Sequence, residues 1–192
     1  MEPHLGNNDI DMFYKHLDKA TNYFEYGSGG STYQANKRDN IEKIYSVESD
    51  EDWHNKLKEE VIGNKITYIY NEMDVLPNTW GHPGPNATEE QKRNYSSHIL
   101  KLSEEEQKKI DLVFIDGRFR VACCLKCFSV INDDCLIAFD DFIDRPFYHG
   151  PVLEFFQIVE KTKDNRMVIL KKKPYVSYVP DEVIKTVELR KM

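Results

Sequence analysis

Residues 23–33 read YFEYGSGGSTY, in which a short apolar run contains a carboxylate and is followed at once by glycine and hydroxyl residues. The apolar run predicts a buried strand, and the glycines predict a sharp turn that a ligand can approach closely. Ser31 or Thr32 lies near the start of a predicted helix over 31–36. Free N–H groups there favour a carboxylate or phosphate. The stretch therefore predicts a ligand-binding turn beside the acid Glu25.

Apolar segments alternate with helical patterns along the rest of the chain. Besides the strand at 22–27, strands are expected at 43–49, 65–72, 111–117, 135–142, 166–173 and 175–179. Besides the helix at 31–36, helices are expected at 9–19, 50–63, 88–102, 121–131 and 152–162. This alternation predicts an α/β fold of the Rossmann-like, doubly wound kind, with a mostly parallel sheet and helices on both faces.

Charged residues follow the expected strands at their carboxyl ends. In a parallel sheet these ends meet at one edge, where ligands bind. The positions that converge there are Glu25–Gly30, Glu48, Glu72–Asp74, Asp116–Arg118 and Asp140–Asp141. The alternative is that Asp and Gly simply form turns and helix caps, as they do after many strands.

The glycine turn does not match the two common phosphate-binding loops. Counted from Gly27, a dinucleotide fingerprint needs glycine where this chain has Thr32, and no Gly-Lys-Ser/Thr follows. The sequence from Glu25 to Ser31, EYGSGGS, instead resembles the first motif of the class I S-adenosylmethionine-dependent methyltransferases, Glu/Asp-x-Gly-x-Gly-x-Gly, with Ser31 in place of the last glycine. The resemblance covers about residues 20–145 and includes YSVESDEDW, FIDGRFR and LIAFDDF.

The resemblance implies S-adenosylmethionine as methyl donor and one domain over 1–192. Residues 1–19 would form an N-terminal helix, 20–145 the cofactor-binding core and 146–192 a C-terminal helix and strands. Glu25 would hold the ammonium directly or through the turn, and Glu48 would accept bonds from the ribose diol. The implied cofactor-binding residues are Glu25, Gly27, Ser28, Gly29, Ser31, Thr32, Glu48 and, near the adenine, Asp74. Alternatively, Glu48 only caps the following helix.

One branch of the family, which includes catechol and sugar O-methyltransferases, uses a divalent ion. The resemblance implies Asp116, Asp140 and Asp141 as its ligands, and such oxygen ligands suit Mg²⁺. The ion would lower the pKa of an acceptor hydroxyl, which makes Asp116 and Asp141 catalytic candidates. His149 is the candidate general base. Alternatively, one aspartate caps a turn, no metal binds and His149 is solvated.

Arginine and aromatic residues expected near the carboxyl ends of the strands are the candidates for binding the methyl acceptor. Arginine recognises carboxylate or phosphate with two parallel hydrogen bonds. The expected acceptor residues are Trp80, Arg118, Arg120, Arg145 and Tyr148. Alternatively, Arg118 pairs with a neighbouring aspartate, Arg120 lies on a solvated helix face and Trp80 fills the edge of the core.

We therefore expect O-methyl transfer to a carbohydrate hydroxyl on a free sugar, a glycan or a nucleotide-linked sugar. A phenolic or natural-product hydroxyl is the second acceptor class. Two other functions stay open: a non-catalytic cofactor- or partner-binding module on the same fold, and an NAD-binding oxidoreductase, which Thr32 disfavours.

Composition limits the partners. The 192 residues carry a formal net charge of −7 at pH 7, which disfavours non-specific binding to nucleic acid. No apolar run is long enough to span a bilayer, and the polar, acidic N-terminus does not resemble a signal peptide. Cys123, Cys124, Cys127 and Cys135 lack disulfide or zinc spacing. We expect a cytoplasmic monomer or homodimer that binds a small-molecule or glycan acceptor and neither nucleic acid nor membrane.

Overall fold

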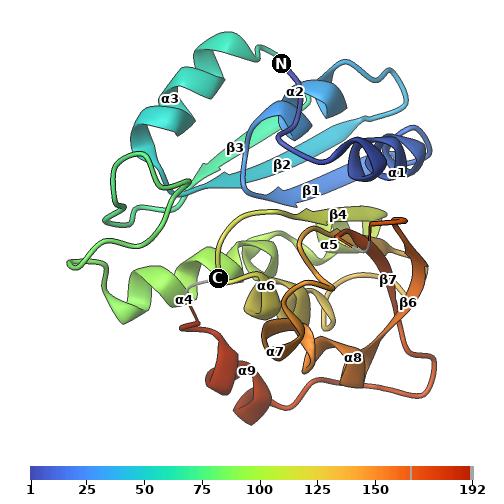
Figure 1. The fold of residues 1–192 in the computed structure, drawn as a ribbon. Coiled ribbons are helices and arrows are strands. Elements are labelled where there is room, and N and C mark those ends of the chain that lie inside the picture. Colours follow the sequence, from blue (N-terminus) through green and yellow to red (C-terminus); the bar gives the residue numbers. More distant parts are fainter. Residues whose placement is uncertain (165, 191–192) are drawn as a thin grey trace.

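Seven strands form one sheet in the order β3-β2-β1-β4-β5-β7-β6 (Figure 1). The computed structural model describes residues 1–164 and 166–190, with backbone only at 147 and 148. The strands are β1 Asn22–Tyr26, β2 Lys43–Glu48, β3 Ile66–Tyr70, β4 Leu112–Ile115, β5 Leu136–Phe139, β6 Phe156–Lys161 and β7 Val168–Lys172. β1 to β5 pair in parallel, whereas β7 is antiparallel to both β5 and β6. The predicted fold class is confirmed.

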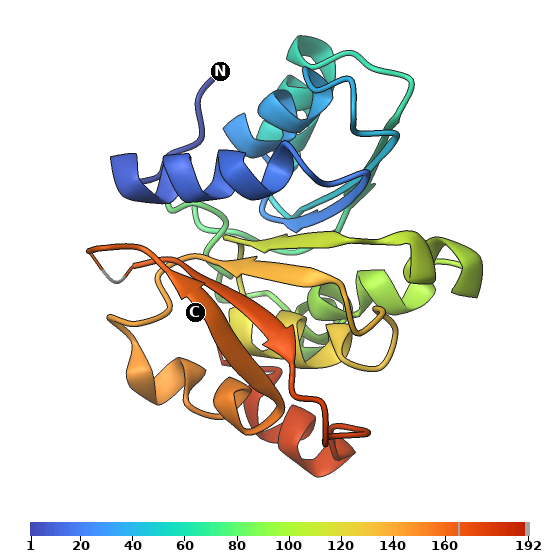
Figure 2. The same cartoon turned by 90° about the vertical axis from the view of Figure 1, so that its right-hand side faces the viewer.

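Helices cover both faces of this sheet. They are α1 Asn7–Leu17, α2 Gly30–Asn36, α3 Glu51–Glu60, α4 Glu89–Ser97, the 3-10 helix η1 His98–Lys101, α5 Glu104–Lys109, α6 Arg120–Cys127, α7 Pro146–His149, α8 Val152–Phe155 and α9 Asp181–Val187. The segment from α7 to α9 lies at the β6–β7 end of the molecule, far from α2 and α3 (Figures 1 and 2).

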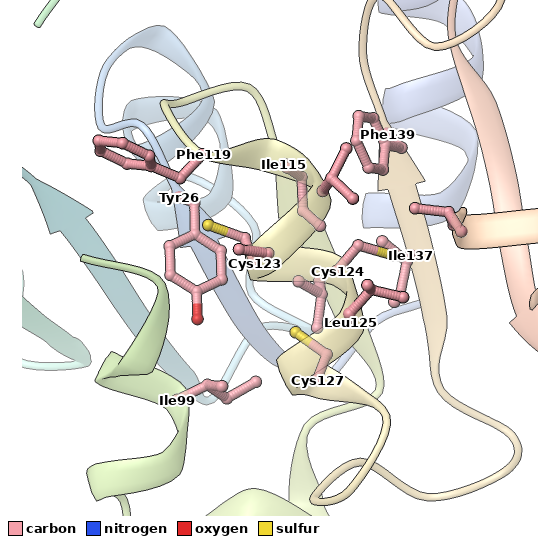
Figure 3. Packing of buried hydrophobic residues seen from close by; sticks show 14 of the residues in the cluster. Tyr26, Ile99, Ile115, Phe119, Cys123, Cys124, Leu125, Cys127, Ile137 and Phe139 are labelled. Atoms are coloured by element: carbon pink, nitrogen blue, oxygen red, sulfur yellow. The ribbon is translucent and has the colours of Figure 1, made fainter. Parts of the chain in front are cut away.

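The two faces of the sheet have separate apolar cores. Successive strand residues point to opposite faces, so Tyr23 joins the cluster beneath α1 while Phe24 joins the cluster beneath α6. In the larger cluster the buried thiols of α6 pack against Tyr26 and Ile115 (Figure 3). All four cysteines are free and buried, and burial raises the pKa of the Cys124 and Cys127 thiols.

Side-chain caps fix where several helices begin. Asp50 accepts a hydrogen bond from Trp53 N (3.0 Å) at the start of α3, and Thr88 forms a capping box with Gln91 at the start of α4. The Asp50 cap starts α3 only two residues beyond the end of β2, so the carboxyl end of that strand leads into a short turn. Across the described residues, no helix combines the length and the apolar character that crossing a membrane requires.

The C-terminal part differs from the prediction. The expected helix over 152–162 is a single turn, α8, followed by strand β6, in which Phe156 is buried and Gln157 exposed. This alternation suits a strand near the edge of a sheet, and pairing with β7 supplies its hydrogen bonds. Residues 175–179 form no strand. α5 and α9 were not expected. α5 buries no side chain and so lacks a helical pattern, whereas the apolar residues of α9, Val183, Ile184 and Val187, do lie at helical spacing and pack against the larger core.

Candidate functional site

The carboxyl ends of β1 and β4 lie side by side where the strand order changes direction, the usual ligand position in such sheets. Two glycines allow the turns after these strands to touch. Gly27 has φ +95°, and a Cβ there would lie 2.8 Å from Gly117 Cα. A Cβ on Gly117 would lie 2.0 Å from the hydroxyl oxygen of Tyr95. Both positions therefore need glycine.

Glu25 is completely buried beneath the glycine turn. Its carboxylate accepts hydrogen bonds from the hydroxyls of Tyr23 (2.9 Å), Ser31 (2.6 Å), Ser46 (2.6 Å) and Thr32. Burial raises the pKa of Glu25, and the hydroxyl donors partly offset that shift. Because the side chain has no exposed surface, these contacts fit a role through the turn and not a direct contact with a ligand.

Glu48, the last residue of β2, lies beside the same turn and is 8% exposed. Its Oε2 accepts from Ser28 N (3.2 Å), and its Oε1 accepts from Ser49 N (2.6 Å) and Asp50 N (2.8 Å). Burial raises the pKa of Glu48 to about 7 despite these backbone donors. The N-cap of α3 is Asp50 and not Glu48. Glu48 thus joins the end of β2 to the glycine turn.

Residues 75–83, here called the 75–83 loop, cover Glu48. Val75 pairs with Pro83 to close the loop. A Cβ on Gly81 would lie 3.3 Å from Ser49 Oγ and 3.8 Å from Glu48 Oε1, so the loop backbone passes directly over this carboxylate. The loop contains three positive φ angles, at Asn78 (59°), Trp80 (58°) and Gly81 (75°). Such strained backbone is often found at binding sites.

Side chains outside the loop hold it in place. Arg118 donates to the carbonyl of Trp80 through Nε (2.9 Å) and Nη2 (2.7 Å). Asp74 accepts from Asn86 N (2.8 Å) at the base of the loop. The Arg118 guanidinium therefore binds the backbone of the loop, and its partner is not the neighbouring aspartate that the sequence offered as the alternative. The Trp80 side chain stays 76% exposed and does not fill the core edge.

The N-terminal segment crosses the start of α2 and reaches the same loop. A Cβ on Gly30 would lie 2.2 Å from the carbonyl carbon of Glu2, so the two backbones are in contact. Glu2 accepts hydrogen bonds from Tyr14 (2.5 Å) and Gln34 (2.9 Å). The His4 ring lies 5.0 Å from that of Trp80. Nothing in the sequence of residues 1–4 predicts this position.

Three aspartates gather at the ends of β4 and β5, around a buried guanidinium. Arg120, the first residue of α6, contacts Asp116 Oδ1 at 2.9 Å, Asp141 Oδ2 at 3.3 Å and Asp140 Oδ2 at 3.5 Å. Asp141 also pairs with Arg145 (2.9 Å) and Arg166 (2.6 Å). We call Asp116, Asp140 and Asp141 the aspartate cluster. Arg120 is not on a solvated helix face, because its side chain is only 6% exposed.

The members of the aspartate cluster differ in charge and access. Burial and the neighbouring carboxylates raise the pKa of Asp140, and burial also raises that of Asp116. Burial would raise the pKa of Asp141 too, but its arginine partners hold it below the usual value. The Asp116 side chain is 28% exposed, against 5% for Asp140 and 9% for Asp141. Only Asp116 is accessible enough to meet an acceptor.

The predicted Mg²⁺ ligands do not fit a metal ion. The Arg120 guanidinium lies among the three aspartate side chains and supplies the positive charge that a metal ion would bring. Throughout residues 1–164 and 166–190, no group of three or more His, Cys, Asp or Glu side chains is arranged to hold a metal. We therefore derive no step through a metal ion.

The expected general base His149 is also placed differently. Its ring is 1% exposed, stacks on Phe142 (4.8 Å between centroids) and meets Phe139 edge-on (4.6 Å). Burial and the charge of Arg120 lower the pKa of His149 to about 4, so the ring is neutral at physiological pH. In this position it cannot meet an acceptor. The side chain of the expected acceptor residue Tyr148 lies outside the described residues.

Comparisons with known proteins identify the fold. The sequence matches no protein-family model and no curated protein. Among solved structures, a methyltransferase-like protein from Silicibacter pomeroyi has a TM-score of 0.78 at 24% identity, over 97% of this chain and 94% of that one. A ribosomal protein L11 methylase from Lactobacillus delbrueckii has a TM-score of 0.55 at 14% identity, over 88% of this chain and 81% of that one. A Bacillus subtilis tRNA methyltransferase has a TM-score of 0.54 at 7% identity, over 90% of this chain and 68% of that one.

The chain has the class I methyltransferase fold. Within this methyltransferase fold, the predicted cofactor-binding residues at the ends of β1 and β2 lie together, whereas Asp74 lies at the base of the 75–83 loop. Among the predicted acceptor residues whose side chains the structure describes, Arg118 binds the Trp80 carbonyl and Arg120 binds the aspartate cluster. The sequence analysis did not identify Ser46, which donates a hydrogen bond to Glu25. A single hydroxyl residue inside the otherwise apolar strand KIYSVE could have indicated it.

Proposed function

We propose that this protein is an S-adenosylmethionine-dependent methyltransferase that methylates a carbohydrate hydroxyl. One observation carries the proposal: the glycine turn after β1 lies at the change of strand direction and is tied to Glu48 by Ser28 N (3.2 Å). A bare backbone next to a fixed carboxylate suits a ligand that has both an amino-acid end and a ribose diol.

The protein's own groups would hold the methyl donor, which supplies an activated methyl group on sulfur. Glu48 would accept hydrogen bonds from the ribose hydroxyls in its ionised form, since an ionised carboxylate is only an acceptor. Glu25 would act through Ser31 and Thr32, whose hydroxyls it fixes. The 75–83 loop would cover the bound ligand from above, because Gly81 lies over Glu48.

Asp116 is the proposed general base. It follows β4 directly, precedes Gly117 at the contact between the two turns, and is the most exposed of the aspartate cluster at 28%. Burial raises its pKa, against the opposing charge of Arg120, and a raised pKa makes a carboxylate a stronger base. Asp116 would receive the hydroxyl proton while the oxygen accepts the methyl group. Holding both reactants at contact distance supplies much of the rate.

The Trp80 ring supports a carbohydrate acceptor. It is 76% exposed beside the proposed donor site and presents a flat apolar face, on which a sugar ring can lie. Two of the structural neighbours methylate, by their names, a ribosomal protein and tRNA. The net charge of −7 works against a polyanionic acceptor such as tRNA. A phenolic hydroxyl uses the same aromatic surface and is the next acceptor class.

A mass-spectrometric screen tests this function. The protein is incubated with S-adenosylmethionine and separate pools of sugars, nucleotide sugars, phenols and tRNA. We expect a one-methyl gain on a carbohydrate, and its loss with Asp116→Asn. Methylation of tRNA or of a phenol alone would overturn the carbohydrate assignment while keeping the methyltransferase.

A non-catalytic ligand-binding module is the second candidate. It is favoured by the contact of Arg120 with all three members of the aspartate cluster, which ties up the carboxylates that could act as bases. This alternative predicts that S-adenosylhomocysteine binds and that no acceptor pool gains a methyl group.

A further inference from the structure

We propose that Arg120 is the built-in cation of the aspartate cluster. Its guanidinium takes the place that a divalent ion would occupy between Asp116, Asp140 and Asp141, so that the site works without a metal. The part of this proposal that concerns catalysis rests on the proposed function, whereas the part that concerns metal binding does not.

The hydrogen bonds of Arg120 show that its position is fixed. Nε donates to the carbonyl of Gly117 (3.0 Å), Nη1 to that of Asp140 (2.8 Å) and Nη2 to that of Asp116 (3.1 Å). These carbonyls belong to the turns after β4 and β5, so one guanidinium joins both strand ends. An ion that displaced Arg120 would leave these donors and acceptors unpaired in a buried place, which is costly.

The same guanidinium also places positive charge beside all three aspartates. Its nitrogens lie 2.9 Å from Asp116, 3.3 Å from Asp141 and 3.5 Å from Asp140. Arg145 and Arg166 contact Asp141 from the other side. Arg120 thus contacts all three aspartates, Arg145 and Arg166 contact Asp141 alone, and the cluster has positive charge beside each member without a metal. A planar fork suits several carboxylate and carbonyl oxygens at once, as a lysine ammonium does not.

Access to the cluster is one-sided. The side chains of Arg120, Asp140 and Asp141 are all less than 10% exposed, whereas that of Asp116 is 28% exposed. Arg120 therefore supplies positive charge from the protein interior, while the Asp116 side chain is partly exposed to solvent. This arrangement keeps positive charge next to the proposed general base without a solvent-accessible ion.

Removal of the guanidinium should convert the cluster into a metal site. The three aspartate side chains are not arranged to hold a metal while Arg120 lies between them. In Arg120→Ala they would lose the guanidinium that separates them and could rotate toward one another, and hard oxygen ligands of this kind bind Mg²⁺ or Mn²⁺. In Arg120→Lys a positive charge remains, so no metal site is expected. The double variant Arg120→Ala, Asp141→Asn removes one ligand and should lose the acquired ion.

Mn²⁺ binding, measured by electron paramagnetic resonance with circular dichroism as a folding check, tests this proposal. We expect no saturable binding to the wild-type protein or to Arg120→Lys. Arg120→Ala should bind Mn²⁺ at least tenfold more tightly than wild type, and the double variant should not. A folded Arg120→Ala that binds no better than wild type would overturn the proposal.

The wild-type titration still decides if Arg120→Ala does not fold. Saturable Mn²⁺ binding to the wild-type protein that Asp141→Asn abolishes would contradict a built-in cation, whereas its absence supports one. Once an acceptor is known, methyl transfer should continue at full rate in excess chelator. Failure to find methyl transfer would count against the proposed function and leave the Mn²⁺ result unaffected.

Discussion

The two halves of the sheet edge satisfy their carboxylates in different ways. At the ends of β1 and β2, Glu25 and Glu48 accept hydrogen bonds from hydroxyls and backbone N–H groups, and neither forms an ion pair with a described residue. At the ends of β4 and β5, the aspartate cluster is surrounded by the guanidiniums of Arg120, Arg145 and Arg166.

This difference suits the two halves to two proposed roles, binding of the methyl donor and deprotonation of the acceptor. Neutral donors leave the β1–β2 half with net negative character, which suits a ligand that brings its own positive charge and hydroxyl donors. Guanidiniums balance the β4–β5 half internally, which suits a site that needs a defined base and no additional ion.

Gly27→Ala should have the largest effect. The new Cβ would meet Gly117 Cα at 2.8 Å and would force alanine to φ +95°. We expect a loss of about 2–4 kcal/mol in the free energy of unfolding and no ligand binding. Gly29→Ala is the control for folding, since its Cβ would come no closer than 3.9 Å to Trp53. Urea denaturation of both variants measures the difference, and equal stabilities would contradict the close contact between the turns.

Ser46→Ala should destabilise the β1–β2 half. The Ser46 hydroxyl donates to Glu25 (2.6 Å), so its removal leaves a buried carboxylate with one partner fewer. We expect a loss of about 1–3 kcal/mol in the free energy of unfolding. Ser129→Ala, which removes only a bond to a carbonyl of its own segment, is the matched control. If both variants unfold at the same urea concentration, the hydroxyl network around Glu25 is not a stabilising element.

The affinity for S-adenosylhomocysteine should depend on pH through Glu48. Its pKa of about 7 means that the accepting, ionised form increases as pH rises through that value. Binding should be about tenfold weaker at pH 6 than at pH 8. Folding stability changes with pH in the opposite direction to ligand affinity. Because the pKa of Glu48 in the folded protein is about 7 and its ordinary value is 4.5, the contribution of Glu48 to the free energy of unfolding decreases as pH rises from 4.5 to about 7. A pH-independent affinity would remove ionised Glu48 from the binding site.

Arg118→Ala should loosen the 75–83 loop. The variant loses both hydrogen bonds to the Trp80 carbonyl, so the loop should cover Glu48 less often. We expect S-adenosylhomocysteine to dissociate roughly three- to tenfold faster, which corresponds to about 0.7–1.4 kcal/mol, the net contribution of one ordinary hydrogen bond. Arg118→Lys, which keeps the charge but not the two-pronged bond, should lie in between. Stopped-flow fluorescence of the two tryptophans, Trp53 and Trp80, follows this rate. An effect on the acceptor KM alone would contradict the loop-holding role and support Arg118 as an acceptor-binding residue.

His149→Phe should have the smallest effect on catalysis. The ring lies between Phe139 and Phe142, and its low pKa makes it a poor base. We expect kcat to change less than about threefold, whereas loss of a general base costs at least about a hundredfold. Steady-state kinetics with the acceptor from the screen decides between the two.

The sequence indicated where the residues of the β1–β2 half lie in the fold, but not which partners the arginines of the β4–β5 half contact, for a physical reason. Glu25, Gly27 and Glu48 depend on local order: a strand end, a turn and the next strand end. The partners of Arg118 and Arg120 come from segments far apart in sequence, and a residue type alone does not reveal whether a guanidinium faces a ligand or the protein. The N-terminal segment was missed for the same reason, since only tertiary contact places Glu2 against Gly30.

The most direct test of the account is a calorimetric titration of S-adenosylhomocysteine into the wild-type protein and Glu48→Ala at pH 8, with NAD as the comparison ligand. We predict one S-adenosylhomocysteine per chain for the wild type, binding at least tenfold weaker in Glu48→Ala, and no heat with NAD. Preferential binding of NAD, or equal affinity of both proteins for S-adenosylhomocysteine, would contradict the claim that the glycine turn and Glu48 together bind the methyl donor.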